Sequence, residues 1–175
     1  LTYVAGWPVL ALGLLSIAAA YLYTGGPKPY GYLGLGDLAV FAFFGPGAVA
    51  GTYYVQALEV SPLAWLASIP IGALATAILV VNNLRDIETD ARAGKNTLAV
   101  RLGDGATRTY YLVLLAIAYL VPLLIWWRGL ASAWVMLPWL SLPLALKLAA
   151  HMRHDRGLAL NGSLVRTAHL EVLFG

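Results

Sequence analysis

Residues 62–101 read PLAWLASIPIGALATAILVVNNLRDIETDARAGKNTLAVR, an apolar run that ends abruptly in a charged stretch. The apolar run, residues 62–84, is long enough to cross the roughly 30 Å hydrocarbon core of a bilayer as one helix. The charged stretch, Asn82–Arg101, carries seven ionisable residues in a chain that is only 11% charged. The pattern predicts a membrane-spanning helix followed by a charged segment at the membrane surface.

The rest of the chain has the same character. Its 175 residues are 61% hydrophobic, whereas a soluble domain averages roughly 45–50% apolar and about 25% charged residues. Apolar segments occur at 3–24, 38–57, 62–84, 107–127, 131–150 and 163–175. We therefore expect an all-α polytopic transmembrane helix bundle, a single membrane domain over 1–175 that has the lipid bilayer as a partner. The absence of cysteine excludes disulfides, and a net charge of +3 is too small to indicate nucleic-acid binding.

The distribution of Lys and Arg predicts the orientation. When the charged stretch is placed on the cytoplasmic side and the spans alternate, ten of the eleven Lys and Arg are cytoplasmic and only Arg128 is outside. The ten are Lys28, Arg85, Arg92, Lys95, Arg101, Arg108, Lys147, Arg153, Arg156 and Arg166. This asymmetry is the positive-inside pattern. Because frequent Ala, Gly, Leu and Arg suggest a bacterial source, the expected location is the bacterial cytoplasmic (inner) membrane, with the charged loops on the cytoplasmic side.

The charged stretch contains a candidate metal site. Asp86 and Asp90 stand four residues apart, so both carboxylates share one face if the helix continues, with Asn82 one turn before them. Mg²⁺ takes oxygen ligands from one or two carboxylates and the remainder from water and substrate phosphates. Lys95 and Arg101 could neutralise a diphosphate. The alternative is a solvated helix end.

Two stretches resemble a known family. Residues 82–103, NNLRDIETDARAGKNTLAVRLG, resemble the second aspartate-rich motif of the UbiA superfamily of intramembrane aromatic prenyltransferases. Residues 23–56, YTGGPKPYGYLGLGDLAVFAFFGPGAVAGTYYVQ, resemble the signature of the branch that acts on 1,4-dihydroxy-2-naphthoate in menaquinone biosynthesis. Together the two stretches cover about a third of the chain.

The resemblance implies a bundle of nine transmembrane helices around a cavity, in which two aspartate-rich motifs bind a polyprenyl diphosphate through Mg²⁺. About six of the nine helices, the fourth to the ninth, would be present here. The first motif, N-D-x-x-D, has no counterpart in the sequence. The expectation is therefore a C-terminal fragment that is inactive alone.

The implied reaction transfers a polyprenyl group to an aromatic acid acceptor, 1,4-dihydroxy-2-naphthoate, which loses its carboxylate. Asp86 and Asp90 would be catalytic metal ligands, and either could instead orient or deprotonate the acceptor hydroxyl. Lys28 could meet the diphosphate or the acceptor carboxylate, or simply follow the positive-inside pattern. Tyr53 and Tyr54 are candidate π-faces for the prenyl cation.

Three other interpretations remain open. The acceptor could be a different aromatic compound, as in other branches of the superfamily. The chain could be a transporter or channel subunit that uses Asp86 and Asp90 as a cation site, although that function favours ionisable groups near the mid-plane of the spans. The third interpretation is a non-catalytic membrane scaffold, which would not need the acidic pair Asp86 and Asp90.

Overall fold

The structure, a computed structural model, describes residues 2–175, and in that part of the chain helices are joined by short loops without any strand. The predicted all-α class is confirmed. The elements, in chain order, are α1 (Thr2–Ala5), α2 (Trp7–Thr24), η1 (Tyr30–Leu33), α3 (Gly36–Ala42), η2 (Phe43–Ala50), α4 (Gly51–Ala57), α5 (Pro62–Arg85), α6 (Ile87–Arg92), α7 (Leu98–Trp127), η3 (Ala133–Ser141), α8 (Leu142–His154), η4 (Gly157–Ala159) and α9 (Leu160–Phe174).

Five helical stretches are long and apolar enough to cross a membrane, and we treat the chain as an integral membrane protein. They are Trp7–Thr24, Gly36–Ala57, Pro62–Arg85, Leu98–Trp127 and Ala133–His154. They match the first five predicted segments, and α9 matches the sixth.

Two predicted boundaries are wrong. The fourth helical stretch begins at Leu98 rather than at 107, and it is broken at Gly103, whose φ of 78° and ψ of 169° are not helical. Only glycine takes such a backbone angle without strain. The predicted polar loop at 151–162 is mostly helical, since α8 extends to His154 and α9 starts at Leu160.

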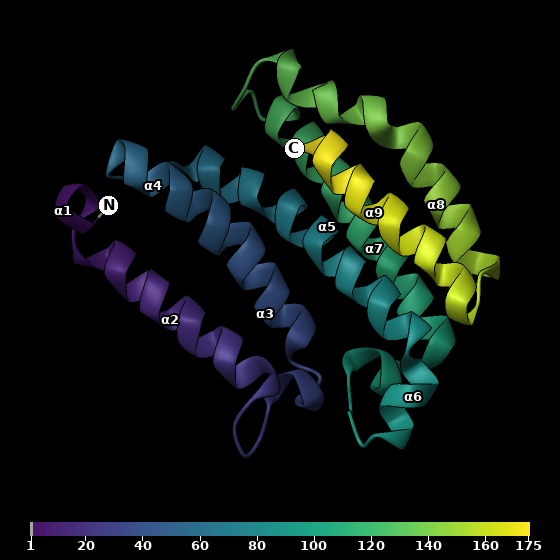
Figure 1. Ribbon diagram of the computed structural model, residues 1–175. Coiled ribbons are helices and arrows are strands. Elements are labelled where there is room, and N and C mark those ends of the chain that lie inside the picture. Colours follow the sequence, from purple (N-terminus) through teal and green to yellow (C-terminus); the bar gives the residue numbers. More distant parts are fainter. Residues whose placement is uncertain (1) are drawn as a thin grey trace.

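Helix α5 lies at the centre of the bundle, between α3 and η2 on one side and α7 and α9 on the other (Figure 1). It begins where the Ser61 hydroxyl accepts a hydrogen bond from the Ala64 amide at 3.1 Å, directly before Pro62. A serine N-cap followed by proline is a strong helix start. The core around α5 consists of Ala73, Leu74, Ala77, Val80, Val81, Leu84, Tyr111, Leu114, Leu115, Ala118, Tyr119, Ala145, Leu148, Met152, Leu160, Leu170 and Phe174.

The second span crosses α5 through a pair of glycines. A Cβ on Gly45 would lie 2.8 Å from the Ser68 carbonyl oxygen and 2.9 Å from the Gly72 Cα. A Cβ on Gly72 would lie 2.9 Å from the Phe41 carbonyl oxygen. The backbones can therefore approach closely only because both residues lack a side chain, as is usual for helix packing in lipid. Next to this crossing, Pro46 lies inside η2, a π-helical segment, because proline removes one helical hydrogen bond and widens the turn.

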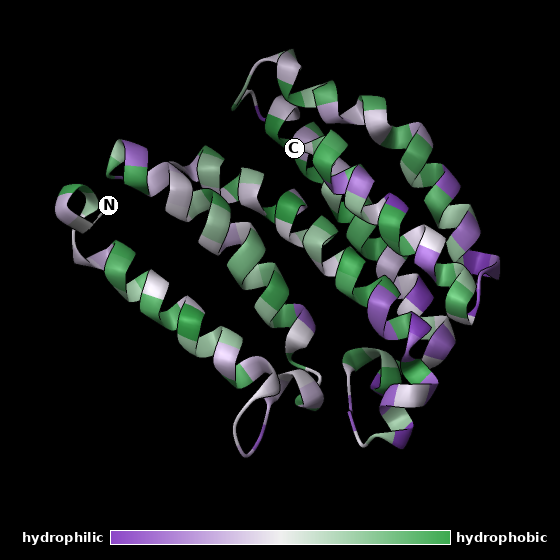
Figure 2. Cartoon of the chain, viewed as in Figure 1, coloured by the Kyte–Doolittle hydropathy of each residue, from purple (hydrophilic) through white to green (hydrophobic). Residues whose placement is uncertain are grey.

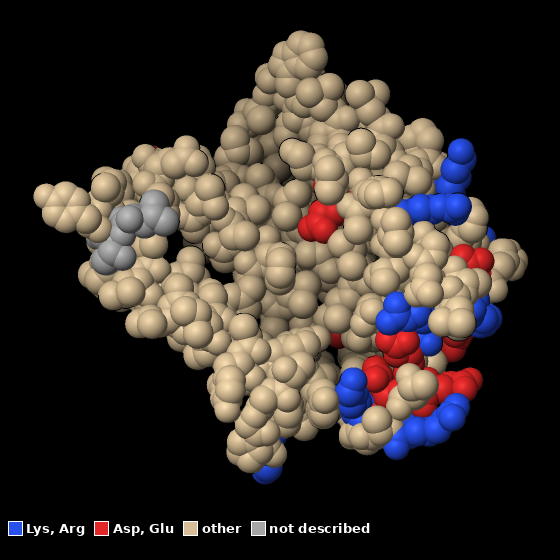
Figure 3. Space-filling model, in the orientation of Figure 1, with Lys and Arg blue, Asp and Glu red and all other residues tan. Residues whose placement is uncertain are grey.

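Polar residues gather at one end of the bundle. Figure 2 shows hydrophilic residues concentrated at α6 and the adjoining ends of α5, α7, α8 and α9. In Figure 3 most of the visible Lys, Arg, Asp and Glu side chains lie over the same region, whereas the opposite end is uncharged in this view. The fold thus carries the Asn82–Arg101 stretch to one polar surface.

Candidate functional site

The junction of α5 and α6 sets the spacing of the candidate metal ligands. Helix α5 ends at Arg85, and Asp86 has φ −98° and ψ 9°, so the helix does not continue undisturbed as expected. The hydrogen-bond ladder nevertheless persists: the Asp86 amide donates to the Asn82 carbonyl at 3.2 Å, and the Asp90 amide donates to the Asp86 carbonyl at 2.8 Å. Because each step is still one helical turn, the three side chains keep a common side of the chain.

Arg85 joins two of these side chains. Its Nε donates to Asp86 Oδ1 at 2.8 Å and its Nη2 donates to Asp86 Oδ2 at 2.6 Å. The same Nη2 donates to Asn82 Oδ1 at 2.8 Å, and Nη1 donates to Asn161 Oδ1 of α9 at 2.9 Å. The two bonds from Arg85 hold the pKa of the Asp86 carboxyl below its ordinary value, against the smaller opposing effect of burial. Arg85 was not among the site residues predicted from the sequence, although its position directly before an aspartate was a signal.

Asp90 has a different cation partner. Its Oδ1 lies 3.3 Å from Lys95 Nζ, and the residue is only 8% exposed. The hydrogen bond to Asp90 raises the pKa of the Lys95 ammonium. Lys95 Nζ also lies 5.1 Å from the centroid of the Tyr32 ring, a cation–π distance. Two predicted site residues are thus brought together as an ion pair.

The turn after α6 packs on the loop between α2 and α3. The Asn96 amide donates to the Tyr32 carbonyl at 3.0 Å, and Arg101 Nε donates to the Asn96 carbonyl at 3.2 Å. A Cβ on Gly34 would lie only 3.0 Å from Arg101 Nε. Arg101 therefore braces the junction of the two motifs, with its side chain exposed at the polar end. Lys28 is exposed on the same loop and forms no ion pair with any residue in 2–175.

Tyr53 and Tyr54 do not lie beside the aspartates. They belong to α4, at the opposite end of the second span from Gly36, which is roughly 25 Å away at 1.5 Å per residue. Figure 1 shows α4 and α6 at opposite ends of the bundle. The two rings thus lie about a span away from Asp86 and Asp90, and their role as π-faces for the prenyl cation stays a prediction.

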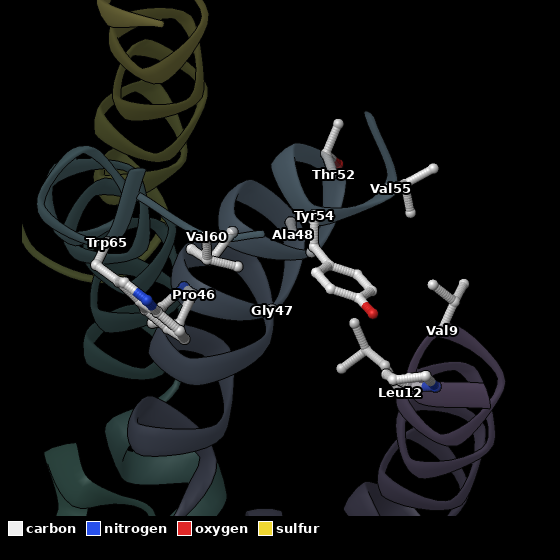
Figure 4. A pocket seen from close by; sticks show the side chains of 13 residues that line it. Val9, Leu12, Pro46, Gly47, Ala48, Thr52, Tyr54, Val55, Val60 and Trp65 are labelled. Atoms are coloured by element: carbon white, nitrogen blue, oxygen red, sulfur yellow. The ribbon is translucent and has the colours of Figure 1, made fainter. Parts of the chain in front are cut away.

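Apolar cavities lie between α2 and the second span. One has a volume of about 590 Å³ and is lined at its polar end by Tyr23 and Tyr30. Another, of about 410 Å³, includes Tyr54, which points from α4 toward Val9 and Leu12 of α2 (Figure 4). Tyr23, Tyr30 and Tyr54 therefore line apolar space, whereas Tyr32 lies against Lys95 at the polar surface.

The described residues contain no group of three or more His, Cys, Asp or Glu able to hold a metal ion. Asp86, Asp90 and the Asn82 amide nevertheless offer the hard oxygens that a divalent metal ion takes, and such an ion needs only one or two carboxylates when phosphates complete its shell. His151 and His154 lie exposed at the end of α8, as expected for solvated residues.

Asp37, in the first turn of α3, was not singled out from the sequence. It is only 4% exposed. Alternation of polar and apolar residues gave no signal for it, because its burial arises from the packing of α3 against other helices.

Comparison with known proteins shows which family the chain matches. Residues 1–161 match the UbiA prenyltransferase family. A relative from Mycobacterium tuberculosis, named 1,4-dihydroxy-2-naphthoate octaprenyltransferase, is 52% identical over 149 residues, which are 85% of this chain and 50% of the relative. A relative of the same name from Escherichia coli is 45% identical over 159 residues, 90% of this chain and 52% of the relative.

A more distant relative from Mus musculus, UbiA prenyltransferase domain-containing protein 1, is 37% identical over 161 residues, 91% of this chain and 46% of the relative. The chain spans about half the length of the curated relatives it matches. The match over residues 1–161 includes both quoted motifs, and the chain belongs to the UbiA prenyltransferase family.

Proposed function

We propose that this chain forms part of a prenyltransferase that transfers a polyprenyl group from its diphosphate to 1,4-dihydroxy-2-naphthoate in menaquinone biosynthesis, with loss of the acceptor's carboxylate. The observation that carries the proposal is the pair of carboxylates, Asp86 and Asp90, one helical turn apart and each held by a cation at the polar end of a membrane bundle. The printed names of the M. tuberculosis and E. coli relatives support the choice of acceptor and suggest an octaprenyl donor.

The acidic and the basic residues of the candidate site would have different roles. Asp86 and Asp90, with Asn82, would hold a divalent metal, which we propose is Mg²⁺. Bound there, the ion would neutralise charge on the leaving diphosphate. Arg85 and Lys95 hold the two carboxylates in place, and each can exchange one bond for a phosphate oxygen. Lys28, on the loop after α2, and Arg101, near the start of α7, are exposed and would add positive charge for the diphosphate.

The polyprenyl chain needs apolar surroundings that exclude water. The cavities between α2 and the second span offer such surroundings, with Tyr23 and Tyr30 at the polar end and Tyr54 at the other. We propose that Tyr53 and Tyr54 contact the distant part of the prenyl chain and not its reacting carbon. The location of Arg128 away from the other Lys and Arg in the alternating spans supports a cytoplasmic position for the charged loops, in the bacterial inner membrane.

We further propose that catalysis requires residues outside these 175. Within residues 2–175 the two carboxylates of α5–α6 have no third acid beside them, and the facing aspartate-rich motif implied by the family would complete the site.

The test is alanine substitution in the full-length protein. Asp86→Ala and Asp90→Ala should each reduce prenyl transfer at least 100-fold, because each removes a charged ligand whose loss costs roughly 3 kcal/mol or more. Product formation is measured with polyprenyl diphosphate, Mg²⁺ and a panel of aromatic acids, which also identifies the acceptor. Glu88→Ala is the matched control, since Glu88 pairs only with exposed Arg92 at 3.1 Å. Full activity of either Asp variant at saturating Mg²⁺ would contradict the metal assignment.

A further inference from the structure

Asp37 is a buried carboxyl with no counter-charge. It is 4% exposed, and within residues 2–175 no Lys, Arg or His lies within ion-pair distance and no side chain donates a hydrogen bond to it. The donor that reaches its carboxyl is its own backbone amide. At the polar end, Asp86 is paired with Arg85, Asp90 with Lys95 and Asp104 with Arg108, and Asp155 accepts a hydrogen bond from the Ser163 hydroxyl. Burying a carboxylate unpaired is costly, so a partner is expected to bind there.

The surroundings of Asp37 connect it to the candidate site. Gly36, the preceding residue, leaves room for the Tyr23 hydroxyl, which lies 3.1 Å from where a Cβ would stand. The charge of Asp37 acts on the hydroxyls of Tyr23 from α2 and Tyr110 from α7. The Tyr23 hydroxyl is also within electrostatic reach of Asp90 and Lys95. Tyr23 therefore lies next to the start of α3, and the loop that follows it carries Tyr32, whose ring centroid lies 5.1 Å from Lys95 Nζ.

A role in helix capping does not account for Asp37. The N-cap of α3 is Leu35, and no side chain caps this helix. Asp37 is an acid in the first turn of α3 and gains from the helix dipole there, but this gain does not supply the counter-charge that a buried carboxylate needs. Within the described residues its carboxyl therefore has a backbone donor but no counter-charge.

The groups around Asp37 favour one kind of ligand. A single carboxylate repels a free diphosphate. The neighbouring groups are phenol rings, and Tyr23 packs edge-on against Tyr30 with centroids 5.5 Å apart. An aromatic compound with a hydroxyl donor satisfies both the carboxylate and the ring surfaces.

We propose that Asp37 binds the aromatic acceptor by accepting a hydrogen bond from one of its ring hydroxyls, with Tyr23 beside it toward Asp90. The inference rests on the proposed prenyl transfer and deepens it, because it gives the acceptor a subsite separate from the metal and diphosphate ligands. It places the ring next to the ion pair of Asp90 and Lys95, where the allylic carbon of the donor would be presented.

The experiment measures acceptor binding separately from transfer. In the full-length protein, Asp37→Asn should weaken binding of 1,4-dihydroxy-2-naphthoate about ten-fold or more, because a charged acceptor of the hydroxyl proton is lost. Binding is measured by tryptophan fluorescence without metal or prenyl diphosphate. The KM for prenyl diphosphate should stay within two-fold of the wild type. Glu59→Gln, at an exposed loop residue, is the matched control and should change neither quantity.

A second ligand tests the hydroxyl itself. 2-Naphthoate, which has the ring and carboxylate but no hydroxyls, should bind the wild type about ten-fold more weakly than the dihydroxy acid and should bind Asp37→Asn no more weakly than the wild type. This wild-type comparison stands even if the variant does not fold. Equal wild-type affinity for the two acids overturns the proposal, as does an unchanged acceptor affinity in a folded Asp37→Asn protein.

The remaining outcomes separate the two claims. A parallel rise in the KM for prenyl diphosphate assigns Asp37 to the metal site and overturns the acceptor subsite. Wild-type protein that binds the dihydroxy acid in an Asp37-dependent way but makes no prenylated product supports the subsite and contradicts the proposed function.

Discussion

Single side chains at the polar end hold one another in place before any substrate binds. Arg85 shares its donors among Asn82, Asp86 and Asn161, so one guanidinium orients two candidate ligands and ties them to α9. A planar fork of five donors suits this task, and a lysine at the same position could not make the bidentate contact. The resulting arrangement keeps Asp86 ionised, which is the state a metal ligand requires.

The pKa of Asp86 gives a prediction at this scale. Because Arg85 lowers that pKa in the folded protein, the ionised carboxylate contributes stability above the unfolded-state pKa, and this contribution is lost as the pH falls through the folded-state pKa. Arg85→Gln removes the cause. The wild type should therefore unfold at a higher temperature than the variant near pH 7, and the difference should shrink as the pH is lowered toward 3.

The measurement is the unfolding temperature in detergent across this pH range. Arg92→Gln, which breaks only the exposed pair with Glu88, should show little difference at any pH. A stability difference for Arg85→Gln that stays constant down to pH 3 would contradict the role of the Arg85–Asp86 pair.

Among the helices, the close crossing of η2 and α5 determines how residues 23–56 lie relative to the aspartates of residues 82–103. The start of α3 lies beside Tyr23 and the end of α5 carries Asp86. The angle between these two spans therefore positions Asp37 relative to Asp86 and Asp90. The crossing depends on Gly45 and Gly72, whose Cα atoms lie against each other. In lipid, such close packing replaces the hydrophobic contrast that drives helix association in water.

A methyl group at the crossing tests this arrangement. Gly72→Ala should destabilise the protein by about 1–3 kcal/mol, because its Cβ would meet the Phe41 carbonyl at 2.9 Å and neither backbone can yield locally. Gly105→Ala is the control, since no atom lies within 4 Å of its Cβ position. Thermal unfolding in detergent checks both variants, and equal stability would show that the spans can separate at this point.

Over the whole molecule, the positive charge at one end predicts that this end lies on the cytoplasmic side of the membrane. Arg153, at the end of α8, and Ala133, at the start of η3, mark opposite ends of one span and are both exposed. The chain contains no cysteine, so a single introduced thiol reports its own location without background.

The sidedness is tested with a membrane-impermeant maleimide. Arg153→Cys should react only in inside-out vesicles, and Ala133→Cys only in right-side-out vesicles or intact cells. The reverse pattern would place the aspartates outside the cell and contradict the cytoplasmic assignment. Neither substitution changes Asp86 or Asp90, so prenyl transfer measured on the same membranes confirms that the labelled proteins are folded.

The sequence by itself determined the membrane class, the six helical segments and the spacing of Asp86 and Asp90. These features are local: burying a backbone in lipid requires an apolar run of helical length, and a four-residue spacing is one helical turn wherever it occurs. It also determined the family, through two motifs whose residues are contiguous.

Only the tertiary structure decided which side chains meet. Arg85 reaches Asn161 across 76 positions, Asp37 is buried by helices distant from it in sequence, and Tyr53 and Tyr54 lie a full span away from the aspartates. The physical reason is that lipid solvates every apolar helix face almost equally, so hydropathy places a segment in the membrane without choosing its neighbours. Close contacts between small residues such as Gly45 and Gly72 make that choice, and they become visible only when the helices are packed.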